Sequence, residues 1–362
     1  MKILVLSCNT GGGHNAAARA IKRELNERGD ECVIRNALDF TPRIKQVITE
    51  EGHSIFYKWM PELYGESYNK ISKKKKHPLL YLDYARFAPE IAVYINENHF
   101  DAVICVHVFP AMMLSAWTKL LSVRAKRYFV ATDYSVAPCL EGTHMDAYFV
   151  PNGCGEIFRK KLPKAKIVET GIPIDSRYYD NISQSDARKA LGLRDDESLV
   201  VIGAGSIGCG PIQEIAERIK LDSEDSTYVA VLCGNNNKLR EELSENTVDA
   251  RFLAIGFTDN VRYWTKAADV FISKAGGLST TEIASAGVPL ILMDAVPGLE
   301  QINLDTFVAW GCAATASTTE GICNLAREFC NKEELRETMI DAQKKNFSTN
   351  AVKKLVDYIS GK

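Results

Sequence analysis

The sequence predicts an α/β protein of two domains, each built on a parallel sheet with flanking helices. Three observations support this prediction. The chain has 362 residues, which is long for a single core. Short apolar runs alternate with helical stretches along the whole chain, and each half contains a glycine-rich turn directly after such a run. Apolar residues make up 46% and charged residues 25%, so both cores can be filled.

The first half begins with an apolar strand over residues 2–7, a glycine turn, and an Ala-rich amphipathic helix over 15–28. A second strand follows at 31–36. Further short apolar runs follow in the rest of this half, with helical stretches between them. This pattern is typical of buried parallel strands. These runs lie at 102–107, 127–132 and 147–150.

The second half repeats the alternation after a Gly-Ile-Pro-Ile hinge at 171–174. Its predicted strands are 199–202, 228–233, 252–256, 270–272 and 288–293, and an amphipathic helix over 350–359 closes the chain. We therefore predict one domain over residues 1–172 and a second over 173–345.

Composition excludes several classes of protein. No apolar run approaches the roughly 20 residues of a membrane-spanning helix, and the first apolar stretch is too short for a signal peptide. The ten cysteines are scattered without a Cys-x-x-Cys pair, which predicts reduced thiols and a cytoplasmic protein. Residues 1–170 carry 24 Lys and Arg against 18 Asp and Glu, whereas the remainder carries 20 against 28. We expect the basic half to face an anionic surface, with no nucleic acid as partner.

Residues 43–90 interleave aromatic, aliphatic and lysine side chains. This mixture suits the surface of a membrane, where apolar anchors enter the headgroup region and lysines approach anionic lipid. The alternative is an inserted helical hairpin whose lysines form a solvated turn. The residues predicted to touch the membrane are Phe56, Trp59, Tyr64, Lys73, Lys74, Lys75 and Lys76.

His14 follows the first glycine turn, where Gly11, Gly13 and Ala16 formally match a dinucleotide-binding fingerprint. At a helix start the macrodipole favours a neutral imidazole, which can accept a proton. Asp133 follows a predicted strand, as does His107. Since ligands in open α/β sheets bind beyond the strand carboxyl ends, we expect His14 and Asp133 to converge. Both could instead serve as polar residues at helix caps.

The stretch 269–303 reads as strand, glycine pair, helix, strand and polar loop. Gly276 and Gly277 let a ligand approach the backbone, and the amides of the next helix favour a phosphate. The Glu282 carboxylate suits a ribose diol, and the loop that ends at Asn303 suits sugar hydroxyls. The alternative is that Ser279 or Thr280 caps the helix and that Glu282 completes a capping box.

Two further turns of the second half carry binding chemistry. The glycine-rich turn 203–211 can cradle a diphosphate with its amides and the Ser206 hydroxyl. Phe257 or Thr258, after the strand 252–256, can offer backbone groups to the edge of a base.

Four motifs together resemble one family over essentially the whole chain. They are the Gly-Gly-Gly-His turn, the Gly-Phe-Thr loop, the Gly-Gly-Leu-Ser-Thr-Thr-Glu helix and the Pro-Gly-x-Glu-x-x-Asn loop. This family is the monogalactosyldiacylglycerol synthase and processive diacylglycerol glucosyltransferase family. The resemblance implies the GT-B fold of family 28 type, in which two Rossmann-like domains face a central cleft. It also implies that residues 346–362 form a helix that packs back toward the first domain.

The resemblance implies an inverting transfer of glucose or galactose from a UDP-sugar to diacylglycerol or a related membrane glycolipid, on the inner face of the cell membrane. It draws the base from His14 and Asp133, and it implies neither a metal ion nor another cofactor, because helix-start amides can stabilise the leaving group. The implied donor-binding residues are Gly13, Gly205, Ser206, Gly208, Phe257, Thr258, Gly276, Gly277, Leu278, Ser279, Thr280, Glu282, Glu300, Gln301 and Asn303.

Other functions stay open at this point. A transferase that uses UDP-N-acetylglucosamine, a UDP-sugar 2-epimerase on the same fold, or a non-catalytic nucleotide-sugar sensor would share these motifs. A nicotinamide dehydrogenase would leave the motifs of the second half unexplained. The spelling around Leu299 differs from the family's usual Pro-Gly-Gln-Glu, so the donor sugar is left open.

Overall fold

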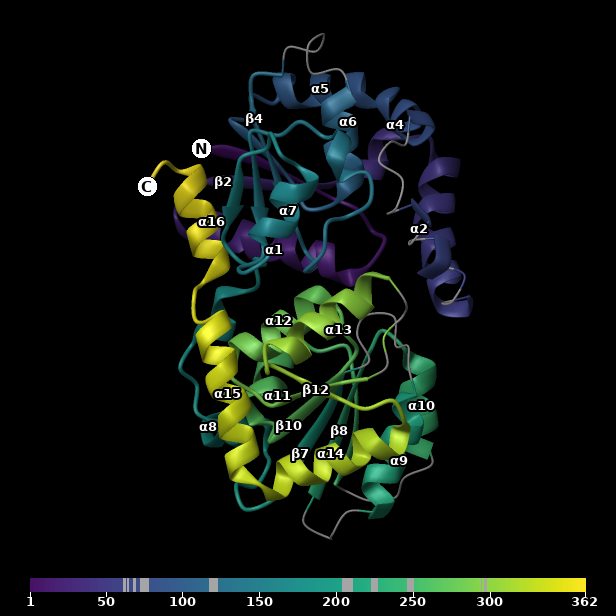
Figure 1. The fold of residues 1–362 in the computed structure, drawn as a ribbon, viewed down its shortest axis with the longest axis vertical. Helices are drawn as coiled ribbons and strands as arrows, with labels where there is room; N and C mark the ends of the chain where they lie inside the picture. Colours follow the sequence, from purple (N-terminus) through teal and green to yellow (C-terminus); the bar gives the residue numbers. More distant parts are fainter. Residues whose placement is uncertain are drawn as a thin grey trace. The chain divides into compact units, whose positions relative to one another are not determined.

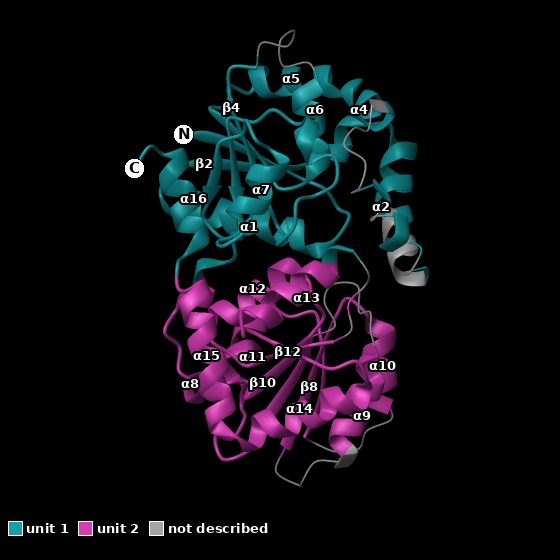
Figure 2. Cartoon of the chain, in the orientation of Figure 1, with its two compact units in different colours: residues 1–176, 296–299, 349–362 teal, residues 177–295, 300–348 magenta. Residues whose placement is uncertain are grey.

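The computed structural model describes residues 1–60, 63, 65–67, 70–71, 78–116, 123–203, 211–222, 227–245, 251–293, 295 and 298–362, without the side chains at 51, 53–59, 78, 221 and 222. The chain divides into two compact units (Figure 2). Unit 1 comprises residues 1–176, 296–299 and 349–362, and unit 2 comprises 177–295 and 300–348.

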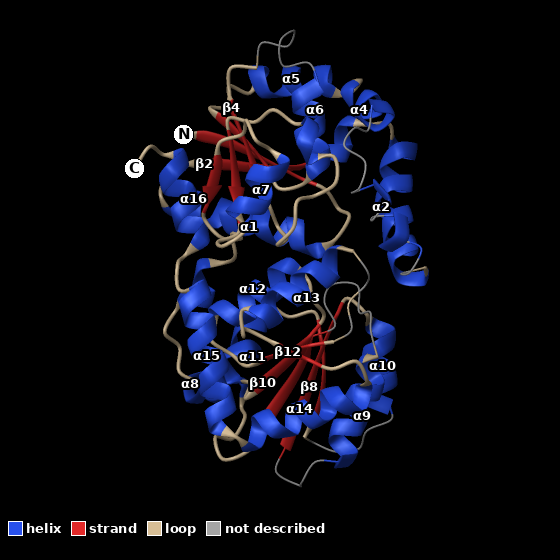
Figure 3. Cartoon of the chain, in the orientation of Figure 1, coloured by secondary structure: helices blue, strands red, loops and turns tan. Residues whose placement is uncertain are grey.

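Unit 1 is built on a six-stranded parallel sheet in the order β2-β1-β3-β4-β5-β6 (Figure 3). The strand order reverses at β1, whose neighbours are β2 on one side and β3 on the other. Parallel strands connected in this way form their ligand crevice at the reversal, beyond the strand carboxyl ends. The strands are β1 (Lys2–Ser7), β2 (Glu31–Asn36), β3 (Ala102–Cys105), β4 (Lys126–Val130), β5 (Ala147–Val150) and β6 (Ile167–Glu169).

Helices flank this sheet, and the last helix of the chain is one of them (Figure 1). α16 (Ala351–Ile359) buries Val352, Leu355 and Val356 in the same apolar cluster as Ile3 of β1. Its i, i+3, i+4 spacing gives one apolar face, which explains the docking. The other helices of unit 1 are α1 (Gly12–Glu27), α2 (Arg43–Trp59), α4 (Pro78–Ala85), α5 (Ala88–Glu97), α6 (Val108–Ala116) and α7 (Gly155–Lys161), with 3-10 turns η1 (Ala37–Phe40) and η2 (Leu140–Gly142).

Unit 2 contains a second six-stranded parallel sheet, in the order β12-β11-β10-β7-β8-β9. Its order reverses at β7, which lies between β10 and β8, so the turns after β7 and β10 flank the expected crevice. The strands are β7 (Ser198–Gly203), β8 (Thr227–Gly234), β9 (Phe252–Gly256), β10 (Val270–Ser273), β11 (Leu290–Leu292) and β12 (Ala314–Thr315).

The helices of unit 2 cover both faces of its sheet (Figure 3). They are α8 (Gln184–Leu191), α9 (Ile212–Asp222), α10 (Asn237–Glu245), α11 (Val261–Ala267), α12 (Gly277–Ser285), α13 (Leu299–Ala309), α14 (Thr319–Asn331) and α15 (Glu333–Phe347), and a 3-10 turn, η3 (Ser176–Tyr179), lies at the boundary of the two units. The predicted α/β class with two Rossmann-like sheets is confirmed.

Two predicted boundaries were wrong. The helix after the first glycine turn was predicted to begin at residue 15, whereas α1 begins at Gly12. Ser7 Oγ of β1 donates to Asn15 Oδ1 at 2.6 Å, which ties the start of this helix to the end of the strand. The polar loop predicted to end at Asn303 is instead the first turns of α13, which begins at Leu299.

Residues 43–90 contribute α2, α4 and the start of α5 to unit 1. In the part of the chain that the structure describes, no helix combines the length and apolar character needed to cross a bilayer. The nine described cysteines form no disulfide, and eight of them are buried.

Candidate functional site

The reversal point of the unit 1 sheet gathers polar groups from three strand ends. His14 lies in the first turn of α1, after β1. Its Nδ1 is 2.9 Å from the backbone oxygen of Val106, which follows β3, and 3.1 Å from Oγ1 of Thr132, which follows β4. His14 is half-buried and Thr132 is 8% exposed, so the cluster opens to solvent only in part.

Asp133 reaches this cluster through its neighbour Thr132. The Thr132 hydroxyl donates to Asp133 Oδ2 at 3.3 Å while its oxygen lies 3.1 Å from His14 Nδ1. The two residues predicted to supply the base therefore belong to one hydrogen-bonded group.

His107 is a member of the cluster that the set of predicted site residues left out. Its ring centroid is 4.6 Å from that of His14, with the planes nearly perpendicular. Its Nδ1 accepts a hydrogen bond from the Phe109 amide at 3.1 Å, and its Nε2 is 3.4 Å from Thr10 Oγ1. In the sequence, His107 stands at the end of an apolar run, which could have indicated a site residue, but it belongs to none of the recognised motifs.

The predicted phosphate turn of unit 2 lies at the other reversal point. β10 ends at Ser273, Gly276 forms the N-cap of α12, and the helix begins at Gly277. The amides of a first helical turn have no partner within the helix, so they can bind an anion. Gly13 of unit 1 is likewise in a first turn, that of α1, and is exposed.

The hydroxyls after the glycine pair do not cap the helix. Thr280 Oγ1 and Ser279 Oγ both donate backward to the Gly276 carbonyl, at 2.8 and 3.3 Å. Because Gly276 is the N-cap, Glu282 lies in the second turn of α12 rather than at the third helical position of a capping box. The capping interpretation is therefore wrong, and Glu282 is half-buried in the second turn.

Space beside Gly276 is restricted by its own neighbours. A Cβ atom added there would lie 3.2 Å from Ser279 Oγ and 3.9 Å from Lys274 Cε. A larger residue would press on the hydroxyl that the helix start positions, which explains glycine at this point. Leu278, between these residues, is buried.

Two of the residues predicted to bind the sugar contact this turn and support it. Asn303 is fully buried and its Nδ2 donates to the Ala275 carbonyl at 3.0 Å. Glu300, 8% exposed, forms an ion pair of 2.9 Å with Lys274. Gln301 instead bonds along the helix to Asp305. Sequence reasoning missed Lys274, because a single lysine beside a glycine pair belongs to no short motif that we recognised.

The loop after β9 has one exposed aromatic ring. Phe257 is 73% exposed, and Thr258 Oγ1 accepts the Asn260 amide at 3.0 Å, which shapes the turn into α11. An exposed aromatic ring is a surface on which a base can stack. Gly205, Ser206 and Gly208 lie outside the described residues, as do the side chains of Phe56, Trp59, Tyr64 and Lys73 to Lys76.

Comparison with known families bears on both units. The family model described as monogalactosyldiacylglycerol (MGDG) synthase matches residues 14–174, and that described as the glycosyltransferase family 28 C-terminal domain matches residues 199–355. A processive diacylglycerol beta-glucosyltransferase from Bacillus pumilus is 26% identical, covering 93% of this chain and 89% of its own. Its counterpart from Bacillus mycoides is 28% identical, covering 86% and 81%.

This chain belongs to the monogalactosyldiacylglycerol synthase and processive diacylglycerol glucosyltransferase family. The resemblance drawn from its motifs is confirmed. In this chain His14, His107 and Thr132 lie in the part matched by the synthase model, and Gly276 and Gly277 lie in the part matched by the family 28 model.

Solved structures show how widely the fold is used. MurG from Acinetobacter baumannii superposes with a TM-score of 0.62 at 17% identity, covering 100% of this chain and 99% of its own. The spinosyn rhamnosyltransferase SpnG with thymidine diphosphate gives 0.67 at 11%, covering 99% and 100%. A Listeria monocytogenes protein assigned as a UDP-N-acetylglucosamine 2-epimerase gives 0.63 at 15%, covering 99% and 95%. At such identities the likeness shows the fold, and the GT-B prediction is confirmed.

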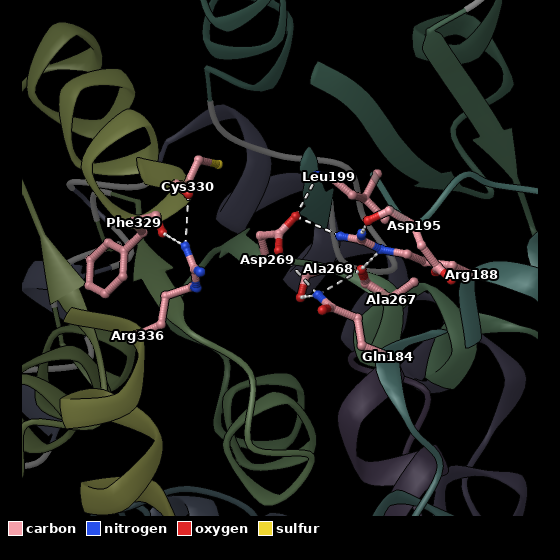
Figure 4. Close-up of polar contacts among 10 residues, drawn as sticks. All are labelled: Gln184, Arg188, Asp195, Leu199, Ala267, Ala268, Asp269, Phe329, Cys330 and Arg336. Atoms are coloured by element: carbon pink, nitrogen blue, oxygen red, sulfur yellow. Dashed lines mark hydrogen bonds and ion pairs between the residues drawn. The ribbon is translucent and has the colours of Figure 1, made fainter. Parts of the chain in front are cut away.

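Asp269 anchors the amino end of β10, whereas the glycine pair follows the carboxyl end. Figure 4 shows the polar contacts of Asp269. Its Oδ2 accepts the Leu199 amide and the Arg188 guanidinium, both at 2.7 Å. Arg188 is 4% exposed and also donates to the carbonyls of Ala267 and Asp195, at 3.1 and 2.9 Å. The pair of buried Arg188 and half-buried Asp269 therefore fixes β10 against β7 and the end of α11.

A cavity of about 570 Å³ lies at this amino end, lined in part by Lys266, Asp269 and Arg336. Burial lowers the pKa of Lys266, whose ammonium donates to the Ala286 carbonyl at 2.8 Å. None of the predicted site residues lines the cavity. Within the described ranges, no group of three or more His, Cys, Asp or Glu is arranged to hold a metal ion.

We predict that Arg188→Met destabilises unit 2 strongly. The substitution removes the buried guanidinium that pairs with the half-buried Asp269 carboxylate; breaking a buried pair by removing one partner typically costs about 3–5 kcal/mol. The matched control is Arg194→Met, since Arg194 pairs with Asp196 in an exposed place where both side chains are about two-thirds accessible and almost no loss of stability is expected. Urea unfolding followed by circular dichroism measures both. Equal losses of unfolding free energy would contradict the anchoring role.

Proposed function

We propose that this chain transfers a hexose from a UDP-sugar to diacylglycerol or a related membrane glycolipid. The observation that carries the proposal is that a chain of this family contains two candidate sites, one in each unit. A histidine and carboxylate cluster lies at the sheet reversal of unit 1, and a phosphate-type helix start lies at the sheet reversal of unit 2. The relatives that match most of the chain are diacylglycerol glucosyltransferases by name.

We assign the acceptor to residues 1–172 and the donor to residues 173–345. Gly276, Gly277 and the first turn of α12 approach the diphosphate, together with the turn that contains Ser206. Glu282 accepts hydrogen bonds from the ribose, and the ring of Phe257 offers a stacking surface to uracil. Lys274 joins this assignment because its side chain passes beside Gly276.

The reaction follows from these assignments. A base of the unit 1 cluster takes the proton of the acceptor hydroxyl, whose oxygen attacks the anomeric carbon. The bond from that carbon to the diphosphate oxygen breaks, and the electron pair leaves with UDP. Amides at the start of α12 stabilise the charge that develops on the departing diphosphate. A single displacement of this kind inverts the anomeric centre.

A second candidate, an epimerase acting on UDP-N-acetylglucosamine, is favoured only by the fold shared with the Listeria protein. Such an enzyme would produce a new nucleotide sugar and no lipid product. The two functions are therefore separated by their products.

The test is a matrix of donors and acceptors. We expect the purified chain, incubated with diacylglycerol liposomes and UDP-glucose, UDP-galactose or UDP-N-acetylglucosamine, to form a hexosyl lipid detectable by mass spectrometry. We expect the same product in excess EDTA, because the proposed leaving-group stabilisation uses backbone amides. Formation of an epimer without lipid product would favour the second candidate, and no turnover of any donor would refute the transferase. Loss of activity in EDTA with recovery on adding a divalent cation would refute metal independence.

Glu282→Gln tests the donor site. Replacing the carboxylate with an amide removes an ionised acceptor of ribose hydroxyls, so we expect the KM for the UDP-sugar to rise about tenfold, equivalent to about 1.4 kcal/mol. Little change is expected in kcat. The control, Glu334→Gln, alters an exposed glutamate of α15 and should leave both constants unchanged. Unaltered UDP-sugar kinetics in Glu282→Gln, with unaltered UDP binding by calorimetry, would remove Glu282 from the site.

We further propose that the α2 and α4 region docks on the membrane at its cytoplasmic face. α2 exposes Ile44 and Ile48, 76% and 66% accessible, and α4 exposes Leu79 and Leu82, 81% and 67% accessible. The Lys45 and Asp83 side chains pair, which ties the two helices together. Exposed aliphatic residues at helical spacing suit insertion among lipid headgroups. The predicted contacts of Phe56, Trp59, Tyr64 and Lys73 to Lys76 extend this proposal.

The double variant Ile48→Asn with Leu79→Asn should weaken membrane binding. Loss of two apolar side chains from the interface is expected to reduce sedimentation with anionic liposomes at least about tenfold. The control is Ile157→Asn, a substitution of an exposed isoleucine on α7 of the same unit. Equal sedimentation of the unaltered chain, the double variant and Ile157→Asn would contradict the assignment of this surface.

A further inference from the structure

We infer that Thr132 is the positioning residue that connects the ring of His14 to Asp133, and that His14 and His107 are held in opposite tautomers. The inference deepens the proposed function and rests on it. It gives Asp133 a role that is exerted through Thr132. Its evidence is the hydrogen bonding of two adjacent histidines.

The backbone decides which nitrogen of His14 carries the proton. Nδ1 lies 2.9 Å from the Val106 carbonyl oxygen, and a carbonyl oxygen can only accept a hydrogen bond. Nδ1 must therefore be protonated. In the neutral ring the proton acceptor is then Nε2. No substitution of a side chain removes this constraint, because the partner is the main chain.

Thr132 completes the other side of the ring. Its oxygen lies 3.1 Å from Nδ1, so it can share the Nδ1 proton with the Val106 carbonyl, and its own hydroxyl proton is directed to Asp133 Oδ2 at 3.3 Å. Thr132 is 8% exposed, which limits competition from water. When Nε2 takes a proton the ring becomes positive, and the carboxylate stabilises that charge through the hydroxyl. Asp133 thus acts through Thr132.

His107 is held in the opposite tautomer. The Phe109 amide can only donate, and it lies 3.1 Å from His107 Nδ1, so that nitrogen is unprotonated. The proton of the neutral ring is on Nε2, which lies 3.4 Å from Thr10 Oγ1. Protonating His107 would break the bond from Phe109 and would place a second positive ring 4.6 Å from His14. His107 therefore stays neutral beside the ring that becomes charged.

The first experiment observes the tautomers directly. Long-range ¹H–¹⁵N correlation spectra of the full chain labelled with ¹⁵N-histidine are recorded at about pH 8, above the ordinary pKa of histidine. Among the signals of the six histidines, those of His14 and His107 are identified by their loss in His14→Gln and His107→Gln. We expect the Nδ1–H form for His14 and the Nε2–H form for His107. An Nε2–H form of His14 would overturn the inference, and this reading requires no catalysis.

The second experiment tests Thr132 by kinetics. Thr132→Val keeps the shape and removes the hydroxyl, so we expect kcat to fall about 10- to 100-fold with the KM for the UDP-sugar nearly unchanged. Thr132→Ser restores the hydroxyl and should recover most of kcat. Thr143→Val is the matched control, since Thr143 is an equally buried threonine of unit 1 whose hydroxyl bonds to the Leu140 carbonyl and Tyr148.

Three further outcomes would each lead to a different conclusion. If Asp133→Asn abolishes transfer while Thr132→Val retains full kcat, Asp133 acts directly and the inference is overturned. If Thr143→Val lowers kcat as much as Thr132→Val, the effect is one of stability, and the positioning role is also overturned. If the unaltered chain transfers no sugar to any acceptor, the proposed function fails, whereas the tautomers of His14 and His107 can still be read.

Discussion

The parallel orientation of every pairing in both sheets is the constraint on which the candidate sites depend. Parallel strands end at a common edge, and the registers Leu6 with Cys105 and Cys105 with Phe129 bring the ends of β1, β3 and β4 level. β3 lies between the other two strands. The turns after β1 and β4 therefore meet over the end of β3, where the Val106 carbonyl is available to His14. Side chains more than 110 residues apart in sequence become hydrogen-bonded neighbours for this reason.

In unit 2 the same constraint acts through one short strand. β10 has four residues, and buried polar contacts hold both of its ends. Asp269 binds Arg188 and the Leu199 amide at the amino end, and Asn303 binds the Ala275 carbonyl beyond the carboxyl end. Such groups are stable in a core only when their hydrogen bonds are satisfied, so the strand is fixed in position along its length. The helix start at Gly276 is then presented in a fixed place.

Sequence reasoning located the strands that have strong apolar runs, because burial on both faces of a parallel sheet leaves a continuous hydrophobic segment. It missed β6 and β12, which have three and two residues and are too short to show such a run. It placed Gly276, His14 and Asp133 near strand ends, and Glu282 further along the helix that follows Gly276. It did not place His107 in the site, and it did not find the buried contact by which Asn303 supports the turn. These roles arise from contacts across 26 or more residues, which no local pattern contains.

The histidine cluster illustrates why a motif can identify a candidate base without explaining which of its nitrogens carries the proton. Gly13 and His14 can be recognised in sequence, but the proton on Nδ1 is determined by a main-chain oxygen of another strand, and any residue at position 106 would supply that oxygen. Thr132 and Asp133 contribute through their side chains. The tautomer is therefore a property of the fold, whereas stabilisation of the charged ring is a property of two particular residues. Substitutions should separate the two, because loss of Thr132 can weaken the charged state while the backbone continues to hold the neutral ring in place.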